Sequence, residues 1–155
     1  MSAILITAGA TRNPLDAIRY LSAFSSGSTG VGLARALSED HTVHLLGSAE
    51  ACLRAPEGLS TEEFTSTRDL MARMERWVRA NPDGVVIHAS AVGDYEAIPE
   101  DEQDGPAKIP SGKAELLLRL RPTPKIVDAI SGWSDSVRII SFKAASPETL
   151  SLIHI

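Results

Sequence analysis

Cysteine is almost absent from this chain: Cys52 is the single one among 155 residues. An internal disulfide is therefore excluded, and the composition fits a reducing compartment, so we expect a cytoplasmic protein. No apolar run approaches about 18 residues and no stretch has the form of a signal peptide, so we expect no membrane partner. Basic residues are also in the minority, with 15 Lys and Arg against 20 Asp and Glu. The net charge of −5 argues against a nucleic-acid partner, because duplex binders normally carry a basic face.

Short apolar runs that end in small residues are present instead, and they are typical of strands buried in a parallel sheet. The runs that predict strands cover residues 4–6, 42–47, 85–89 and 137–142. Apolar residues at helical spacing predict helices that begin near residues 31 and 67, and a proline predicts a further helix over residues 125–130. The order predicts an α/β fold, a Rossmann-like doubly wound, mostly parallel sheet with helices on both faces. Residues 11–30 and 49–62 are predicted as loops, and residues 114–120 as a strand or hairpin arm.

The segment before the first predicted helix has the composition of an anion site. It contains Ser25, Ser26 and Gly27, whose hydroxyls and open backbone suit a phosphate at the first free N–H groups of a helix. The alternative is a helix that Ser28 or Thr29 caps, with glycines for close packing. Ligands in doubly wound sheets lie beyond the carboxyl ends of the strands. Residues 9–11, 47–48 and 90–91 should therefore face one crevice.

Residues 6–30, ITAGATRNPLDAIRYLSAFSSGSTG, resemble the N-terminal signature of the phosphopantothenoylcysteine synthetases, also called phosphopantothenate–cysteine ligases. That family typically reads ITxGGTxExIDxVRxIxNxSSGxxG. The matching positions include Thr7, Gly9, Thr11, Asp16 and the pair Arg19-Tyr20, followed by Ser25-Ser26-Gly27. The family's asparagine falls on Ala23, which cannot donate a hydrogen bond.

Four blocks later in the chain extend the resemblance. Residues 88–95 (HASAVGDY) are similar to the family's AAAVADY or HSMAVSDY, and residues 108–111 (KIPS) stand where KIKK or KISS is expected. Residues 122–126 (PTPKI) and 139–143 (IISFK) resemble its TPKI segment and its GF(A/K) strand. These spellings are closer to the stand-alone synthetase than to the form fused to a flavin-dependent decarboxylase.

The resemblance implies a ligase that joins 4'-phosphopantothenate to L-cysteine in coenzyme A biosynthesis. The carboxylate would first attack a nucleoside triphosphate, CTP or ATP, to give an acyl-nucleotidylate, and Mg²⁺ is the expected cofactor. The implied partners are these small molecules and a second copy of the chain in a homodimer.

The resemblance also assigns residues to roles. Lys108 would stabilise the charge that builds on the α-phosphate, and Asp94 would orient the nucleotide or anchor its loop. Arg19 would either bind the acidic substrate or form a structural ion pair. In full, the implied set is Lys108 and Asp94 for catalysis, His88, Ala89, Ser90, Asp94, Lys108, Thr123, Pro124, Lys125, Ile126 and Phe142 for the nucleotide, and Gly9, Thr11, Arg19, Ala23, Ser25, Ser26 and Gly27 for phosphate or substrate. Metal ligands are not assigned.

Two other functions compete with this one. A nicotinamide-dependent oxidoreductase of the short-chain type needs a Tyr-x-x-x-Lys pair, but Tyr95 is followed four residues later by Pro99. A non-catalytic nucleotide-binding module would keep the fold and lack the asparagine at position 23. A test for pyrophosphate release separates the three functions.

The last six residues, LSLIHI, do not continue the family pattern. One reading frame of a transposon end used in sequencing libraries encodes the same hexapeptide. We therefore expect residues 1–149 to form a single, incomplete synthetase domain and residues 150–155 to be a non-native tail. Such a chain would have little ligase activity until family-like residues extend it, and a genuine stop codon after position 155 in an independent clone would contradict this expectation.

Overall fold

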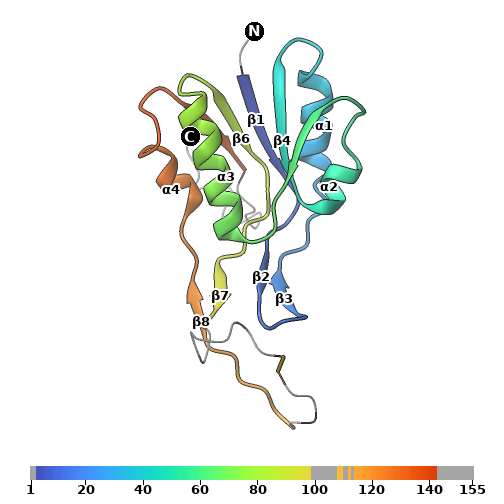
Figure 1. Cartoon of the computed structure of the whole chain (residues 1–155), viewed down its shortest axis with the longest axis vertical. Coiled ribbons are helices and arrows are strands. Elements are labelled where there is room, and N and C mark those ends of the chain that lie inside the picture. The colour runs from blue at the N-terminus through green and yellow to red at the C-terminus, as the bar shows by residue number, and fades with distance from the viewer. Residues whose placement is uncertain (1–2, 99–107, 110–111, 113, 143–155) are drawn as a thin grey trace, which may run out of the picture.

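A five-stranded parallel sheet forms the centre of the molecule (Figure 1). The computed structural model describes residues 3–98, 108–109, 112 and 114–142. The strands stand in the order β5-β4-β1-β6-β9 and are β1 (Ala3–Ala8), β4 (Thr42–Gly47), β5 (Ser60–Glu63), β6 (Val85–His88) and β9 (Arg138–Ser141). The chain builds outward from β1 to β5 and then returns to β6 and β9. The strand order therefore reverses between β1 and β6, which is where doubly wound sheets bind ligands.

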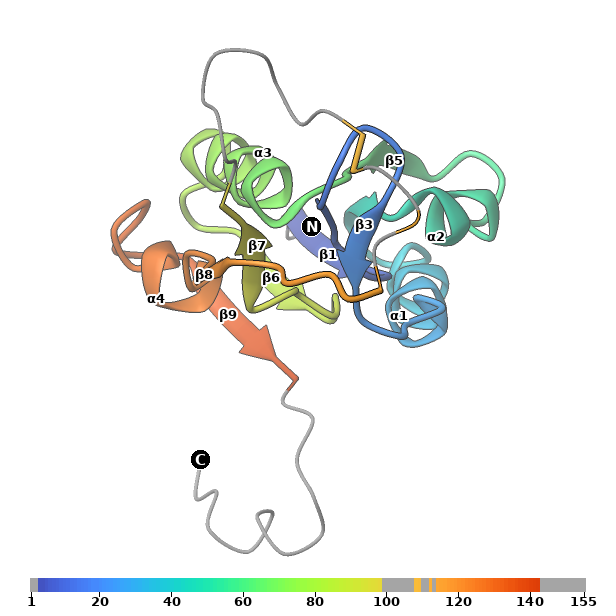
Figure 2. The same cartoon turned by 90° about the horizontal axis from the view of Figure 1, so that it is seen from below.

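Helices cover both faces of this sheet (Figure 2). They are α1 (Ser28–Leu37), α2 (Ala49–Leu53), α3 (Thr67–Ala80) and α4 (Ile126–Ile130). Alternate residues of β1 face the two layers: Ile4 and Ile6 pack in the cluster that contains α1, and Leu5 packs in the cluster that contains α3 and α4. The predicted Rossmann-like, doubly wound sheet with helices on both faces is confirmed.

Two antiparallel hairpin ladders lie beyond the carboxyl ends of the central strands (Figure 1). One pairs β2 (Arg12–Pro14) with β3 (Tyr20–Ser22), and the other pairs β7 (Tyr95–Ala97) with β8 (Leu120–Pro122). The prediction of a loop over residues 11–30 is wrong, because the first ladder and the start of α1 lie inside it. Ladders of three residues carry too little apolar periodicity to be read from a sequence.

Two further sequence predictions are wrong. Residues 49–62, predicted as a loop, contain α2 and most of β5; α2 is a five-residue helix capped by Ser48, and β5 is an edge strand of polar residues. Residues 114–120, predicted as a strand, are irregular up to Arg119, and strand pairing begins at Leu120. The leucines at 116, 117 and 118 are exposed, so no neighbouring layer forces them into a pleated conformation.

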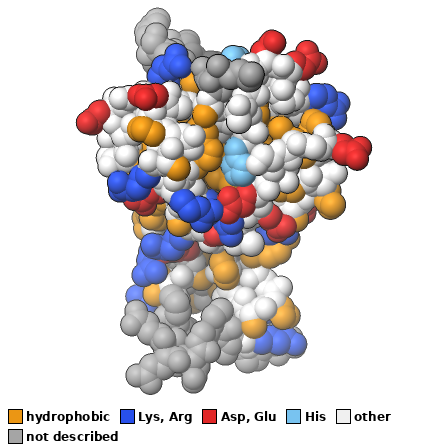
Figure 3. Space-filling view, turned by 45° about the horizontal axis from the view of Figure 1, so that its top comes forward, with side chains coloured by type: hydrophobic (Ala, Val, Ile, Leu, Met, Phe, Trp, Pro, Cys, Tyr) orange, Lys and Arg blue, Asp and Glu red, His pale blue; other side chains and the backbone are white. Residues whose placement is uncertain are grey.

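Acidic and basic side chains are interspersed over the face in Figure 3. Within the described residues, no helix has the length and apolar character needed to cross a membrane. The proposed tail at residues 150–155 lies outside the described residues.

Candidate functional site

The N-terminus of α1 lies directly against the carboxyl ends of β1 and β4. Gly9 and Gly27 both have left-handed backbones, with φ of 91° and 73°. A Cβ on Gly27 would stand 2.9 Å from the Gly9 nitrogen, and a Cβ on Gly9 would stand 2.2 Å from the Ser48 hydroxyl oxygen. Both positions therefore need glycine for conformation as well as for space.

The N-cap residue of α1 has no side chain that could cap the helix. Gly27 is the N-cap residue, so the alternative in which Ser28 or Thr29 caps the helix is wrong. The Ser25 hydroxyl accepts a hydrogen bond from the Gly27 N–H at 3.4 Å, and the Ser26 hydroxyl accepts one from the Ser28 N–H at 3.4 Å. The first turn contains no acidic residue, so the helix presents N–H groups and hydroxyls to an incoming anion.

The residues predicted to share a crevice do lie together. The Ala91 N–H donates to the Gly9 carbonyl at 2.8 Å, and the Thr11 N–H donates to the Ala91 carbonyl at 3.1 Å. On the other side, the Ser48 N–H donates to the Ala8 carbonyl at 2.9 Å. The three strand ends therefore meet at the switch point of the sheet.

A buried set of polar groups, which we call the threonine network, holds the loop after β6. It consists of Thr11, Asn13, Thr67, Gly93 and Thr123. The Thr11 hydroxyl accepts the Gly93 N–H at 2.8 Å, and the Thr123 hydroxyl donates to the Gly93 carbonyl at 2.7 Å. The Thr67 hydroxyl lies 3.2 Å from both the Thr11 hydroxyl and the Gly93 carbonyl. The side chains of Thr11 and Thr123 therefore position a loop.

Asn13 extends this network to the second hairpin ladder and was not singled out from the sequence. Its amide nitrogen donates to the Tyr95 carbonyl at 2.8 Å, and its amide oxygen accepts the N–H of Thr67 at 2.9 Å. Only 1% of Asn13 is exposed, so both bonds form away from water. A polar residue before Pro14 reads as an ordinary turn, and nothing in the sequence shows that it is buried.

His88 is neutral and oriented by Thr7. The Thr7 hydroxyl accepts the Ser90 N–H at 3.1 Å and lies 2.8 Å from His88 Nδ1. Burial lowers the pKa of His88 from 6.5 to about 4, because the charged imidazole would be desolvated. Among the described residues, no carboxylate forms an ion pair with it. The Ser90 hydroxyl oxygen is buried without a hydrogen-bond partner in the described structure.

Asp94 and Lys125 form an exposed ion pair beside this loop. The Asp94 carboxylate raises the pKa of Lys125 through a hydrogen bond and its charge. The neighbouring candidates differ in exposure: Ile126 is 3% exposed and packs in the core, whereas Phe142 is 56% exposed. The Phe142 N–H lies 3.4 Å from the His88 carbonyl, so the residue follows the end of β9 at the switch point.

Asp16 tethers the segment that contains Lys108 to the turn between β2 and β3. Its carboxylate accepts the N–H groups of Ile18, Arg19 and Ile109 at 2.9, 2.7 and 3.1 Å and forms an ion pair with Arg19. Burial opposes its charge, but these hydrogen bonds prevail and lower the pKa of Asp16 from 3.8 to about 2. The structural ion pair, one of the two alternatives for Arg19, is therefore present. Lys108 is exposed next to Ile109, and no described contact joins it to Asp94.

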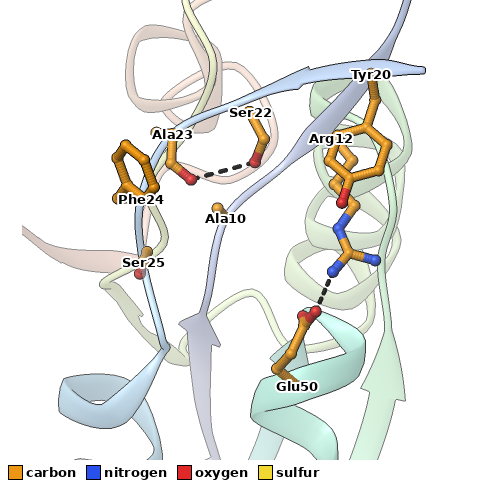
Figure 4. Close-up of a pocket in the computed structure, with 8 residues that line it drawn as sticks. All are labelled: Ala10, Arg12, Tyr20, Ser22, Ala23, Phe24, Ser25 and Glu50. Carbon is orange, nitrogen blue, oxygen red and sulfur yellow. Dashed lines mark hydrogen bonds and ion pairs between the residues drawn. The ribbon is translucent and has the colours of Figure 1, made fainter.

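A cavity of about 340 Å³ opens between the first hairpin ladder and α2 (Figure 4). Its lining residues are Ala10, Arg12, Tyr20, Ser22, Ala23, Phe24, Ser25 and Glu50. Arg12 and Glu50 form an ion pair, and the Arg12 guanidinium lies 5.1 Å from the centre of the Tyr20 ring. Of these, Ala23 and Ser25 were expected from the sequence, and Arg12, Tyr20 and Glu50 were missed. Only the tertiary structure brings position 12 against position 50.

Comparison with known proteins places the chain in a family. Residues 1–152 match the family model described as the DNA/pantothenate metabolism flavoprotein C-terminal domain. The coenzyme A biosynthesis bifunctional protein CoaBC of Thermococcus kodakarensis is 32% identical over 146 residues, which are 91% of this chain and 34% of that protein. This chain thus spans about a third of the length of the curated relatives that it matches.

Solved structures agree with this placement. The DNA/pantothenate metabolism flavoprotein from Streptococcus pneumoniae superimposes with a TM-score of 0.74 at 28% identity, over 90% of this chain and 68% of that one. A Cab2 mutant in complex with phosphopantothenate-cysteine has the same fold, with a TM-score of 0.76 at 19% identity over 96% of this chain and 66% of that one. The chain therefore belongs to the family of DNA/pantothenate metabolism flavoprotein C-terminal domains.

Proposed function

We propose that this chain is a phosphopantothenate–cysteine ligase domain, which joins 4'-phosphopantothenate to L-cysteine in coenzyme A biosynthesis. The observation that carries the proposal is the uncapped start of α1, which lies against Gly9 at the switch point of the sheet in a member of this family. Phosphates of either substrate suit that helix end. The names of the matched relatives, which are coenzyme A biosynthesis proteins, support the same pathway. Whether the synthetase stands alone or is fused to a decarboxylase stays a prediction.

The proposed reaction has two steps. A carboxylate oxygen of phosphopantothenate attacks the α-phosphorus of CTP or ATP, and pyrophosphate leaves with the electrons of the broken P–O bond. The amine of cysteine then attacks the acyl carbon and displaces the nucleoside monophosphate. Negative charge builds on the α-phosphate in the first step, and Lys108 is the cation proposed to stabilise it. Its side chain is exposed, and the neighbouring Ile109 is bonded to Asp16, which leaves the lysine available to a ligand.

The nucleotide is proposed to lie along the ends of β6 and β9. His88, Ala89 and Ser90 would line it, together with residues 123–126 and Phe142. Thr123 and Ile126 would contact the nucleotide through backbone groups, because the Thr123 hydroxyl is bonded to Gly93 and the Ile126 side chain is in the core. The unpartnered Ser90 hydroxyl is the side-chain group free to bond the ligand. Asp94, paired with Lys125, would orient the sugar.

The described residues do not form a cage for Mg²⁺. Within that part of the chain, no three His, Cys, Asp or Glu side chains gather where they could hold a metal ion. Mg²⁺ is proposed to enter with the triphosphate, whose oxygens are ligands that this ion prefers. None of the roles proposed for side chains depends on the ion.

The test is a pyrophosphate assay on the purified chain with Mg²⁺, phosphopantothenate and either CTP or ATP, with and without L-cysteine. Pyrophosphate release that requires phosphopantothenate supports the proposal, and the faster nucleotide identifies the natural donor. Nucleotide binding without pyrophosphate release in the chain and in a version extended by family-like residues would instead support the non-catalytic module. The oxidoreductase would be identified by reduction of a nicotinamide cofactor.

A homodimer and a cytoplasmic location belong to the same proposal. Apolar side chains are exposed on and beside the second hairpin ladder, and a second copy of the chain would bury them there. They belong to Tyr95, Leu116, Leu117, Leu118 and Leu120. Light scattering coupled to size-exclusion chromatography measures the mass directly. A monomer at all concentrations tested would contradict the dimer.

A further inference from the structure

Two opposite charges line the cavity beside the first hairpin ladder, and the roles proposed so far use neither of them. Arg12 comes from β2 and Glu50 from the first turn of α2, and the two side chains meet at the wall of the cavity (Figure 4). The Tyr20 ring lies beside the guanidinium and limits its movement. Ala23, which the family resemblance places at the substrate, lines the same cavity.

Both charged groups keep bonding capacity in this arrangement. A guanidinium has five N–H donors, and the described contact with Glu50 uses one nitrogen of Arg12. The side chains of Arg12 and Glu50 are 34% and 50% exposed, so a small molecule in the cavity reaches both. An ion pair of this kind presents a positive and a negative end at neighbouring positions.

We propose that this cavity binds the amino-acid substrate, with its α-carboxylate on Arg12 and its α-amino group on Glu50. The inference rests on the proposed ligase function, which requires an amino acid beside the acyl-nucleotidylate. A free amino acid is a zwitterion whose two charges are two bonds apart, and it matches a preformed pair of opposite charges better than any singly charged molecule of its size. The volume of about 340 Å³ lies at the small end of ligand sites, as a molecule the size of cysteine requires.

The charge states support this assignment at neutral pH. Hydrogen bonds from its own backbone N–H and from Ser48, together with the charge of Arg12, lower the pKa of Glu50 against the effect of burial. Glu50 is therefore a carboxylate that accepts hydrogen bonds from an amino group but is a weak base. In the transfer step the cysteine nitrogen forms the amide bond and the acyl–oxygen bond to the nucleotide breaks. The nucleoside monophosphate keeps the electron pair of that bond, and the two protons that the ammonium group loses pass to solvent.

Binding of small probe molecules tests the inference without requiring turnover. The isotope-labelled chain is titrated with L-cysteine under reducing conditions, and backbone amide shifts are followed by NMR. Cysteamine lacks the carboxylate, and 3-mercaptopropionate lacks the amino group. We expect L-cysteine to shift amides around the cavity with saturation and to bind at least about tenfold more tightly than either analogue, because each lost charge-assisted contact has about that effect.

Two substitutions test whether Arg12 and Glu50 cause these binding preferences. Arg12→Met should remove the preference for L-cysteine over cysteamine, and Glu50→Gln should remove the preference for L-cysteine over 3-mercaptopropionate. Arg79→Met is the matched control, because it removes an exposed ion pair with Glu75 on α3 and should keep both preferences. Thermal unfolding of each variant verifies that it is folded. Each binding preference is a ratio of two affinities measured on the same protein, so a uniform loss of stability does not produce the same result.

The outcomes separate this inference from the proposed function. Absence of saturable shifts at concentrations about tenfold above the usual KM range of up to about 1 mM would overturn the inference, as would preferences that survive both substitutions. The proposed function instead stands or falls with pyrophosphate release that depends on phosphopantothenate. A chain that releases pyrophosphate but binds the three probes equally would keep the function and lose this site.

Discussion

The two sides of the β1 carboxyl end are built from similar polar residues in opposite ways. Toward β6, the threonine network and the Thr7–His88 pair are buried, and the N–H and C=O groups of Gly93 are bonded within the protein. Toward α2, Arg12 and Glu50 meet at an open cavity with donors and acceptors to spare. Polar groups that are saturated in a dry setting fix a backbone, whereas polar groups with unused bonds beside a cavity bind ligands. We therefore assign the positioning of the loop after β6 to the threonine network, and recognition of the amino acid to the Arg12–Glu50 pair.

Substitution of the exposed Lys108 has the largest expected effect. Lys108→Gln should lower phosphopantothenate-dependent pyrophosphate release by about 10²–10³, because one preorganised charge at a developing anion has that effect. Urea unfolding should be unchanged, since the side chain is exposed. Arg79→Gln, on the solvent face of α3, is the control. Near-parental release by the Lys108 variant would remove this residue from the mechanism.

On the side toward β6, burial of His88 makes the stability of the fold depend on pH. Its pKa is about 4 in the folded protein against an ordinary value of 6.5, so the unfolded chain binds more protons between these values. Stability should fall as the pH drops from 6.5 towards 4, by about 3 kcal/mol from this group alone. Urea unfolding of the parent and of His88→Gln across this range measures it. Equal slopes in the two proteins would show that His88 does not contribute.

Ala23→Asn tests the side toward α2, because Ala23 lines the cavity there. We expect it to raise the fraction of cleaved nucleotide that ends in product, because an amide can donate to an oxygen of the acyl-nucleotidylate. One hydrogen bond to a charged group contributes roughly 1.5–3 kcal/mol. Product and pyrophosphate are measured in the same reaction, and Ala23→Leu, which adds volume without a donor, is the control. Unchanged coupling would mean that a neighbour such as Ser22 already supplies the donor.

The smallest expected effect distinguishes saturated from unsaturated hydroxyls. Thr11→Val removes the acceptor of the buried Gly93 N–H and should cost about 1–3 kcal/mol of unfolding free energy. Ser90→Ala removes a buried oxygen that has no partner among the described residues, so it should leave stability within about 0.5 kcal/mol of the parent. Its effect should appear instead as a higher KM for the nucleotide. Equal destabilisation by both substitutions would contradict this distinction between bonded and unbonded hydroxyls.

Much of the fold could be predicted from sequence because its determinants are local. The apolar runs at residues 42–47 and 85–89 correspond to β4 and β6, and strands that are covered on both faces lack polar alternation. The helix predicted from residue 67 is α3, whose Leu70, Met74 and Val78 are fully buried at the expected spacing. The short ladders and α2 were not predicted, because elements of three to five residues are too short to show a periodic pattern.

The site divides in the same way. The sequence by itself determined the glycine-rich turn at Gly9 and Gly27 and the small residues after β6, because backbone conformation and close approach restrict the residue type at each position. Tertiary structure alone decided that Asn13 is buried against Thr67 and that Arg12 meets Glu50 across 38 residues of chain. Those contacts depend on how β1, α2 and α3 pack. An arginine, a glutamate and an asparagine read as ordinary surface residues until the packing of the sheet brings their partners to them.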